Sequence, residues 1–173
     1  MSSVEDIKKE YESYYAELLS KHKLLRETSL GYYGASPADA VFNFFRKIGL
    51  EKKKNFIDLG SGDGKVVLIA SLFTKAAGIE IDEELVKDAE KIRKRLGMKA
   101  DFIKGDYLDH DISKHDIIFL NPDRHFPELE KKLRKEMKKD ARLVVFGNLY
   151  RPLNMKLEKS FVVDGYGFYI YMI

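Results

Sequence analysis

Five short apolar runs follow Gly49, separated by helical or loop segments, and this alternation constrains the fold more than any other feature. The runs predict strands at Asn55–Leu59, Ala76–Ile81, Ala100–Lys104, Asp116–Leu120 and Arg142–Phe146. We predict the intervening helices at Gly64–Phe73, Glu83–Leu96 and Phe126–Lys139. Strands that are apolar throughout and separated by helices belong to a parallel sheet covered on both faces. The chain of 173 residues suits one such α/β domain.

The last segment, SFVVDGYGFYIYMI, has a different pattern. Two β-rich runs flank Asp164-Gly165, which predicts a hairpin that adds an antiparallel strand to the sheet. The connection between the third and fourth strands, GDYLDHDISKHD, is short for a parallel crossover with a full helix. We therefore expect that crossover helix to be vestigial.

The N-terminal part differs from the rest of the chain. Apolar residues recur near a helical period from Val4 to about Glu27, which predicts one long amphipathic helix. After a glycine-containing loop, Ser36 is the predicted N-cap of a second helix that begins at Pro37 and ends near Ile48. We expect residues 1–35 to form an extension, either a lid over a site or a helix packed on the domain, and residues 36–173 to form the main domain.

Composition excludes several classes of protein. The chain has no cysteine, so disulfide scaffolds, thiolate zinc sites and cysteine nucleophiles are impossible. No apolar run reaches the roughly 18 residues of a membrane span, and the polar start does not resemble a secretory signal, so we expect a cytoplasmic protein without membrane contact. The four histidines show no metal-ligand spacing, and we expect no metal. A net charge of +3 permits contact with nucleic acid or acidic protein and requires neither.

The strongest functional signal is DLGSGDG, residues 58–64, where a buried strand turns directly into a helix. Glycines in such a turn allow tight dihedral angles and bring backbone amides against a ligand. The third glycine of a dinucleotide fingerprint would fall at Lys65, so that motif fails. A phosphate-binding P-loop would need glycine at Leu59 and Ser or Thr at Val66, so that motif fails too.

The stretch FIDLGSGDG instead resembles motif I of class I S-adenosylmethionine-dependent methyltransferases. The resemblance implies a Rossmann-like, seven-stranded, mostly parallel sheet with an antiparallel last strand, and S-adenosylmethionine as the cofactor, with S-adenosylhomocysteine as its product. It implies that the glycine turn lies under the ribose and methionine parts of the cofactor. Asp58 would interact with the methionine amino group or an ordered water, and Asp63 would help to hold the amino-acid end. The cofactor residues implied in this motif are Asp58, Gly60, Ser61, Gly62, Asp63 and Gly64.

The same resemblance implies two further acidic positions at the carboxyl edge of the sheet. Glu80, followed by Ile81, ends the second strand and would grip both ribose hydroxyls with its carboxylate oxygens. Asp106, after the third strand, would accept a hydrogen bond from the adenine amino group, while the adjacent Tyr107 covers the ring. Tyr33, in the N-terminal loop, is included as a cofactor neighbour.

The fourth strand ends in FLNPDR, at the edge where the methyl group should be presented. Enzymes that methylate amino nitrogens of adenine or glutamine have a similar corner, in which Asp or Asn is followed by two prolines and an aromatic residue. Here only Asn121-Pro122 matches that pattern. Asp123 stands in place of the second proline, and Arg124 in place of the aromatic residue. We assign Asn121 and Pro122 as catalytic residues, since the Asn121 oxygen could orient the lone pair of an acceptor amine. Asn121 is also assigned as a cofactor neighbour. Arg124 or His125 would contact the substrate. Asn and Pro are also ordinary turn residues, so a simple strand end is equally compatible with this pair.

Within the class, the sequence most resembles small protein-lysine methyltransferases of archaeal and mitochondrial type. The shared features are a Ser-Pro pair before a helix, DLGSGDG, a GIEID-like strand, the shortened third crossover and the terminal β-hairpin. The resemblance implies a macromolecular methyl acceptor and favours a protein lysine over an RNA base. The excess of basic residues on two predicted helices indicates either a solvated face or an RNA-binding groove. A module that binds S-adenosylmethionine without catalysis is the remaining alternative.

Overall fold

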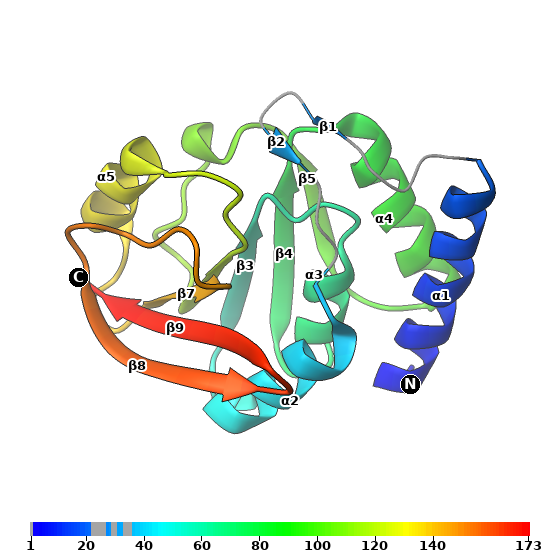
Figure 1. Ribbon diagram of the computed structural model, residues 1–173, viewed down its shortest axis with the longest axis horizontal. Coiled ribbons are helices and arrows are strands. Elements are labelled where there is room, and N and C mark those ends of the chain that lie inside the picture. Colours follow the sequence, from blue (N-terminus) through cyan, green and yellow to red (C-terminus); the bar gives the residue numbers. More distant parts are fainter. Residues whose placement is uncertain (1, 22–26, 29–30, 33–35) are drawn as a thin grey trace.

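The computed structural model describes residues 2–21, 27–28, 31–32 and 36–173. Its centre is a seven-stranded sheet with helices on both faces (Figure 1). The strands, in spatial order, are β5 (Asp101–Lys104), β4 (Lys75–Glu80), β3 (Asn55–Leu59), β6 (Ile117–Leu120), β7 (Arg142–Phe146), β9 (Tyr166–Met172) and β8 (Lys156–Val163). The first five are parallel, and β9 is antiparallel to both of its neighbours. This order and the antiparallel last strand confirm the predicted class I methyltransferase fold.

The crossover helices are shorter than the sequence predicts. They are α3 (Lys65–Ala70), α4 (Glu83–Arg95) and α5 (Pro127–Glu136). The predicted extension of α3 to Phe73 is wrong because the amides of Leu72 and Phe73 bond three residues back, which tightens the chain into turns. α5 ends at Glu136 because Met137 is extended, with a ψ of 137°.

The N-terminal helix also ends early. α1 (Val4–Ser20) is closed by Lys21, and Glu27–Thr28 forms β1, which pairs with β2 (Gly31–Tyr32). The prediction of one helix to Glu27 is therefore wrong. The fully buried residues of α1, Ile7 and Tyr11, lie in its first half, whereas Leu19 near its end is 62% exposed, and helical stability in proteins depends on such packing.

The second helix, α2 (Ala38–Ile48), begins one residue later than predicted. Pro37 is its N-cap residue, and no side chain caps the helix, so the predicted Ser36 cap is wrong. The Ser36 hydroxyl instead accepts a hydrogen bond from Asn121 Nδ2 at 3.4 Å. This contact joins the start of α2 to the end of β6.

The predicted C-terminal hairpin and short crossover are both confirmed. β8 and β9 pair antiparallel across Asp164-Gly165, whose φ angles of +50° and +83° suit a tight hairpin turn. The third crossover contains only η2 (Tyr107–Asp109), a single 3₁₀ turn. Because no long helix fills this connection, the loop after β5 lies directly over the carboxyl edge of the sheet.

β8 forms one edge of the sheet. Six of the eight residues in this strand are exposed, including Lys156, Glu158 and Lys159. Its register against β9 shifts between Leu157 and Lys159, where one extra residue is accommodated. The strand therefore has exposed charged residues in its first half, where its pairing with β9 is also irregular.

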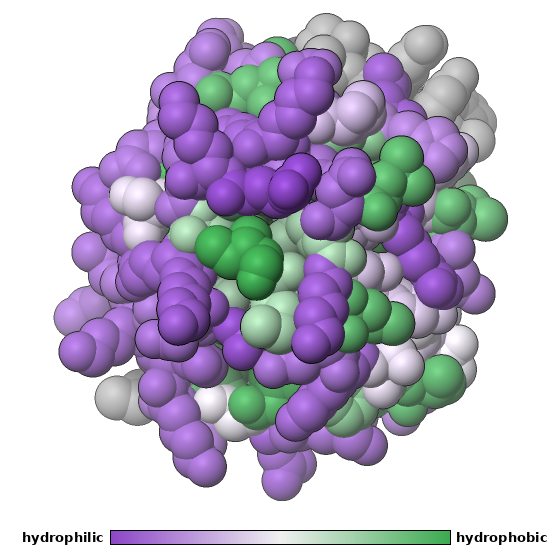
Figure 2. All heavy atoms as spheres, turned by 90° about the vertical axis from the view of Figure 1, so that its left-hand side faces the viewer, coloured by the Kyte–Doolittle hydropathy of each residue, from purple (hydrophilic) through white to green (hydrophobic). Residues whose placement is uncertain are grey.

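Alternate residues of each strand supply two hydrophobic layers. On one face, Phe56 and Phe119 pack with α1, α2 and α3, and Phe44 of α2 stacks on Phe168 of β9 with ring centroids 4.1 Å apart. On the other face, Ile57 and its neighbours pack against α5. Figure 2, which shows the side of the molecule that carries α5, has mostly hydrophilic side chains around a small hydrophobic area.

The segment 147–155 connects β7 to β8 and is fixed to α5. Glu130, which is 4% exposed, accepts hydrogen bonds from the amides of Leu153 and Asn154. The Arg151 guanidinium lies 3.9 Å from the centre of the Tyr169 ring. Among the described residues, no helix is long and apolar enough to cross a membrane.

Candidate active site

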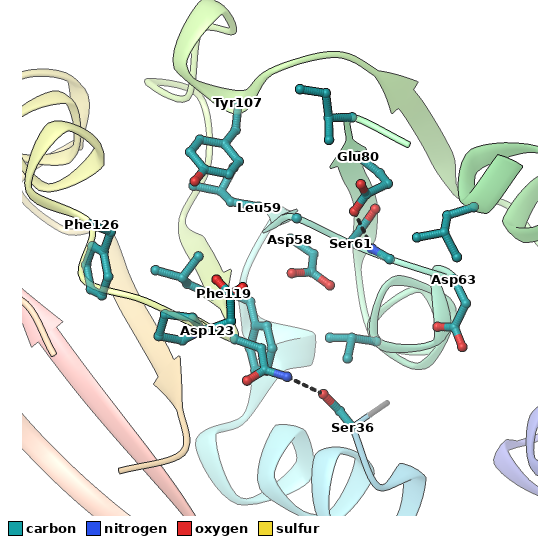
Figure 3. A pocket seen from close by; sticks show the side chains of 18 of the residues that line it. Ser36, Asp58, Leu59, Ser61, Asp63, Glu80, Tyr107, Phe119, Asp123 and Phe126 are labelled. Carbon is teal, nitrogen blue, oxygen red and sulfur yellow. Dashed lines mark hydrogen bonds between the residues drawn. The ribbon is translucent and has the colours of Figure 1, made fainter. Parts of the chain in front are cut away.

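A pocket opens at the carboxyl ends of β3, β4 and β6, beneath the loop that follows β5 (Figure 3). Parallel strands bring these ends to one edge, which is where open α/β sheets bind ligands. Most of the residues assigned from the sequence line this pocket. They are Asp58, Gly60, Ser61, Gly62, Asp63, Glu80, Ile81, Asp106, Tyr107, Asn121 and Pro122.

Two assigned residues do not line the pocket in the structure. Gly64 lies behind it, against α4, where a Cβ atom would stand 2.5 Å from Phe102 Cε1 and 2.8 Å from Ala89 Cβ. This glycine therefore allows close packing against α4, and its predicted contact with the cofactor stays a prediction. Tyr33 lies outside the described residues.

The amides of the glycine turn are bonded within the protein. Gly60 and Ser61 donate to the Ile79 carbonyl, each at 2.9 Å, and Gly64 donates to the Ser61 carbonyl at 2.9 Å. Gly62 donates to Glu80 Oε2 at 2.9 Å. The expectation that bare amides in this turn face a ligand is therefore wrong for these four groups. Their bonds fix the shape of the turn instead.

Glu80 connects the turn to the next helix. One carboxylate oxygen accepts from Gly62, shown as a dashed line in Figure 3, and the other accepts from Asp82 at 2.9 Å. A carboxylate has about four acceptor positions, so each oxygen can accept a further hydrogen bond. Glu80 is 7% exposed and lines the pocket, so it can hold a ribose diol while it braces the turn.

Gly78, in the middle of β4, allows the turn to sit close to the sheet. A Cβ atom there would be 2.6 Å from both Cβ and Oγ of Ser61 and 2.8 Å from Val67 Cγ2. Sequence reasoning did not assign this glycine. Its role depends on the close approach of Ser61 in the glycine turn to β4, and the pattern of strands in the sequence does not reveal this approach.

The charge of the pocket favours a cation. Among the described residues, its charged side chains are the five carboxylates of Asp58, Asp63, Glu80, Asp106 and Asp123 and the two cationic groups of Lys65 and Arg124. Asp58 is 3% exposed and points into the middle of the pocket (Figure 3), and burial, together with the charges of Glu80 and Asp63, raises its pKa well above 3.8. A positively charged ligand relieves this repulsion, whereas a polyphosphate adds to it.

The first helix also contacts the glycine turn. Tyr11, which is 1% exposed, donates to the Asp63 carbonyl at 2.7 Å, and Tyr15 donates to Asp63 Oδ2 at 2.5 Å. Asp63 Oδ1 accepts from the Lys65 amide at 3.1 Å. Both carboxylate oxygens of Asp63 thus have protein partners. Its predicted contact with the cofactor stays a prediction.

The loop after β5 brings a carboxylate and an aromatic ring to the pocket. Asp106 accepts from the Leu108 amide at 2.8 Å, which starts η2. Tyr107 is partly buried, and burial raises the pKa of its hydroxyl. The carboxylate and the ring predicted to bind adenine therefore both line the pocket, and their contact with adenine stays a prediction.

The corner after β6 completes the site. Asn121 donates to Ser36 Oγ, and the apolar side chains of Pro122, Phe119 and Phe126 line the pocket beside it. Arg124 forms an ion pair with Asp123 at 3.3 Å and also lines the pocket. His125 does not line it and instead contacts the Tyr150 ring, with centroids 5.1 Å apart.

Some lining residues were not assigned from the sequence. They are Ser36, Leu59, Lys65, Val66, Leu85, Gly105, Phe119, Leu120, Asp123 and Phe126. Of these, Lys65 directly follows the glycine motif, and this position in the sequence could have indicated that it lines the pocket. Within the described part of the chain, no group of three or more His, Asp or Glu side chains is arranged to hold a metal ion.

The fold and the acidic pocket together define a class I S-adenosylmethionine-dependent methyltransferase. The ANTKMT methyltransferase domain matches residues 58–147, more than half of the chain, and the protein belongs to this family. The matched segment contains the glycine turn, Glu80, Asp106 and the Asn121 corner. The cofactor is S-adenosylmethionine, a sulfonium compound whose positive charge suits the carboxylates of the pocket.

Solved structures share the fold. The RNA methyltransferase from Salinibacter ruber in complex with S-adenosyl-L-homocysteine is 26% identical, with a TM-score of 0.69, covering 81% of this chain and 94% of that chain. The Pyrococcus abyssi tRNA (uracil-54, C5)-methyltransferase in complex with S-adenosyl-L-homocysteine is 16% identical, with a TM-score of 0.63 over 82% of this chain and 40% of its own. The second likeness shows the fold alone.

Two curated relatives match at low identity. The histone H3 lysine-79 specific N-methyltransferase of Drosophila melanogaster is 28% identical over 144 residues, 72% of this chain. The ribosomal protein L11 methyltransferase of Dictyoglomus turgidum is 26% identical over 111 residues, 62% of this chain. The chain matches only 8% and 37% of the lengths of these two relatives.

Proposed function

We propose that the protein transfers the methyl group of S-adenosylmethionine to an amino nitrogen, that of a protein lysine side chain. The observation that carries this proposal is the Asn121 corner, where an exposed, uncharged amide is hydrogen-bonded to Ser36 and the apolar side chains of Pro122 and Phe126 also line the pocket. Such a corner suits a nucleophile that must be oriented and does not need a strong base to remove a proton. The protein acceptors named for the two curated relatives support a protein substrate.

The carboxylates hold the cofactor in this proposal. S-adenosylmethionine, when bound, supplies a methyl group on a positively charged sulfur. Glu80 would bind the ribose hydroxyls, Asp106 would accept from the adenine amino group, and Asp58 would lie near the methionine ammonium. Each oxygen of Glu80 has one hydrogen bond to a backbone amide, so its orientation is set before the ligand arrives.

The Asn121 corner prepares the acceptor. A lysine reacts only as the neutral amine, and burial among Pro122, Phe119 and Phe126 lowers the pKa of its ammonium, whose proton leaves to solvent. Asn121 Oδ1 would accept one N–H of this amine and direct its lone pair toward the methyl carbon. The charge of the nearby Asp123 is balanced by Arg124, which limits its opposing effect on that pKa.

Transfer of a tritiated methyl group tests the proposal. The protein is incubated with methyl-labelled S-adenosylmethionine and a cell extract, and the product is divided between protease and nuclease treatment. We expect protease-sensitive label that hydrolysis recovers as methylated lysine. Asn121→Ala should lower the transfer rate by about a hundredfold, more than it lowers cofactor affinity. Asn43→Ala, which removes an exposed amide that bonds Asp164 at 2.8 Å on another part of the molecule, should leave the rate unchanged.

An RNA acceptor is the alternative, favoured by the likeness to the Salinibacter ruber enzyme. The basic residues of α4 and α5 count against it, because many of them pair with acidic residues one turn away. These pairs are Lys87 with Glu83, Lys91 with Asp88, Arg93 with Glu90, Lys131 with Glu128 and Lys132 with Glu136. Nuclease-sensitive label would replace our proposal with RNA methylation. Cofactor binding without transfer to any extract component would indicate a non-catalytic module.

A further inference from the structure

A buried lysine beside the glycine turn has no part in the function described so far. Lys65 lines the pocket and is 6% exposed. Of the described residues, the only other cationic side chain that lines the pocket, Arg124, belongs to the Asn121 corner and is paired with Asp123. Within that part of the chain, Lys65 is therefore the cation available at the glycine turn.

Aromatic side chains of α1 fix the position of this ammonium. Lys65 Nζ donates to the Tyr15 hydroxyl at 2.9 Å and lies 4.9 Å from the Tyr15 ring centre and 5.6 Å from that of Tyr11. The Tyr15 hydroxyl in turn donates to Asp63 Oδ2. Among the described residues, Lys65 forms no ion pair with a carboxylate. An ammonium has three donors, so the Tyr15 contact leaves capacity for a ligand.

The chemistry of the cofactor calls for such a cation. Its amino-acid end has a carboxylate, which must enter a pocket whose other charges at the glycine turn are Asp58, Asp63 and Glu80. Four backbone amides of this turn, those of Gly60, Ser61, Gly62 and Gly64, are already bonded within the protein. A carboxylate placed there without a cation would be repelled by three acidic groups.

We propose that Lys65 Nζ binds the carboxylate of the methionine part of the cofactor, and that Tyr15 of α1 is a positioning residue for this lysine. The proposal depends on S-adenosylmethionine as the cofactor and not on the identity of the acceptor. Burial lowers the pKa of Lys65, and a bound carboxylate acts in the opposite direction. The first helix then contributes to cofactor binding through Tyr15.

Calorimetry with two ligands tests the assignment. S-adenosylhomocysteine has the carboxylate, and S-adenosyl-3-thiopropylamine lacks only that group. Lys65→Met should weaken binding of S-adenosylhomocysteine by about tenfold to a hundredfold. It should leave the affinity for the decarboxylated ligand unchanged or higher, because the variant pocket is more negative. Lys65→Arg should retain the preference for the carboxylate, and thermal denaturation confirms that each variant is folded.

A pair of tyrosine variants tests the role of α1. Tyr15→Phe should weaken S-adenosylhomocysteine binding by about threefold to tenfold and should affect the decarboxylated ligand less. Tyr14→Phe is the matched control, because Tyr14 is on the same helix and bonds Asp88 Oδ2 at 3.1 Å. It should change neither affinity.

Two results would overturn the proposal. Equal weakening of both ligands by Lys65→Met would show that the lysine supports the turn in general and does not contact the carboxylate. Unchanged affinity for S-adenosylhomocysteine would show that it has no role in binding. Neither result bears on lysine methylation, which the labelling experiment tests separately.

Discussion

Replacement of Gly64 by alanine tests how the glycine turn is packed on α4. A Cβ atom at this position would lie 2.5 Å from Phe102 Cε1, 2.6 Å from Phe102 Cζ and 2.8 Å from Ala89 Cβ. Real Cβ atoms do not approach that closely, so Phe102 or α4 must move. The φ angle of Gly64 is +80°, which also disfavours any residue with a side chain.

Two separate costs add up for this substitution. The left-handed backbone costs about 1–2 kcal/mol for alanine, and overpacking costs about 1–3 kcal/mol. We therefore expect Gly64→Ala to lower the free energy of unfolding by roughly 2–5 kcal/mol. In a chain of this length, that corresponds to a fall in melting temperature of roughly 5–15 °C.

Gly97→Ala is the matched control for this substitution. Gly97 has a φ of +60°, and no atom of the described residues would lie within 4 Å of a Cβ atom there, so alanine should incur the backbone cost alone. Thermal and urea denaturation of both variants give the difference, which we expect to be about 1–3 kcal/mol. Equal destabilisation by the two substitutions would refute the packing role of Gly64.

Three further substitutions have distinct expected outcomes. Asp58→Asn should weaken cofactor binding by about tenfold or more yet stabilise the free protein at neutral pH. The raised pKa of Asp58 means that the folded state binds a proton at this carboxyl more tightly than the unfolded chain does, so the stability of the wild-type protein falls as the pH rises above 3.8. The asparagine variant does not have this loss. A melting-temperature difference between variant and wild type that does not grow with pH would contradict the assignment. Gly78→Ala should cost about 1–3 kcal/mol and reduce cofactor affinity by displacing Ser61, so calorimetry that shows normal affinity would exclude this displacement. Glu130→Ala should speed proteolytic cleavage within 147–155, because two backbone amides lose their acceptor, and an unchanged cleavage rate would show that other contacts hold the segment.

The parts of the fold that follow from local patterns were predictable from the sequence. The bounds of β3 and β7 match the prediction, because each is a short, mainly apolar run that is followed by a glycine. The Asp164-Gly165 turn was predictable for the same reason, since its residues tolerate positive φ angles. The end of α1 was not predictable, because it depends on how far along the helix the packing against the domain continues.

The lining of the pocket was predictable where one strand end supplies one polar side chain. Asp58 and Glu80 lie at the carboxyl ends of their strands and Asp106 follows the next strand, so the parallel sheet brings them to one edge. Lys65 and Gly78 escaped assignment because their roles depend on pairs of elements. Lys65 is positioned by a helix that lies about 50 residues earlier, and Gly78 is required by the turn that returns over β4.

The outer edge of β8 has a consequence for colloidal behaviour. An exposed edge strand offers unpaired backbone groups to a second chain and can seed aggregation. In β8, Lys156, Glu158 and Lys159 place charge along this edge, and the register shift at Leu157 breaks its regular spacing. The exposed Val162 near the turn, 74% accessible, lies beyond these charges. Neutralising the two lysines should therefore promote self-association at high protein concentration without changing the pocket.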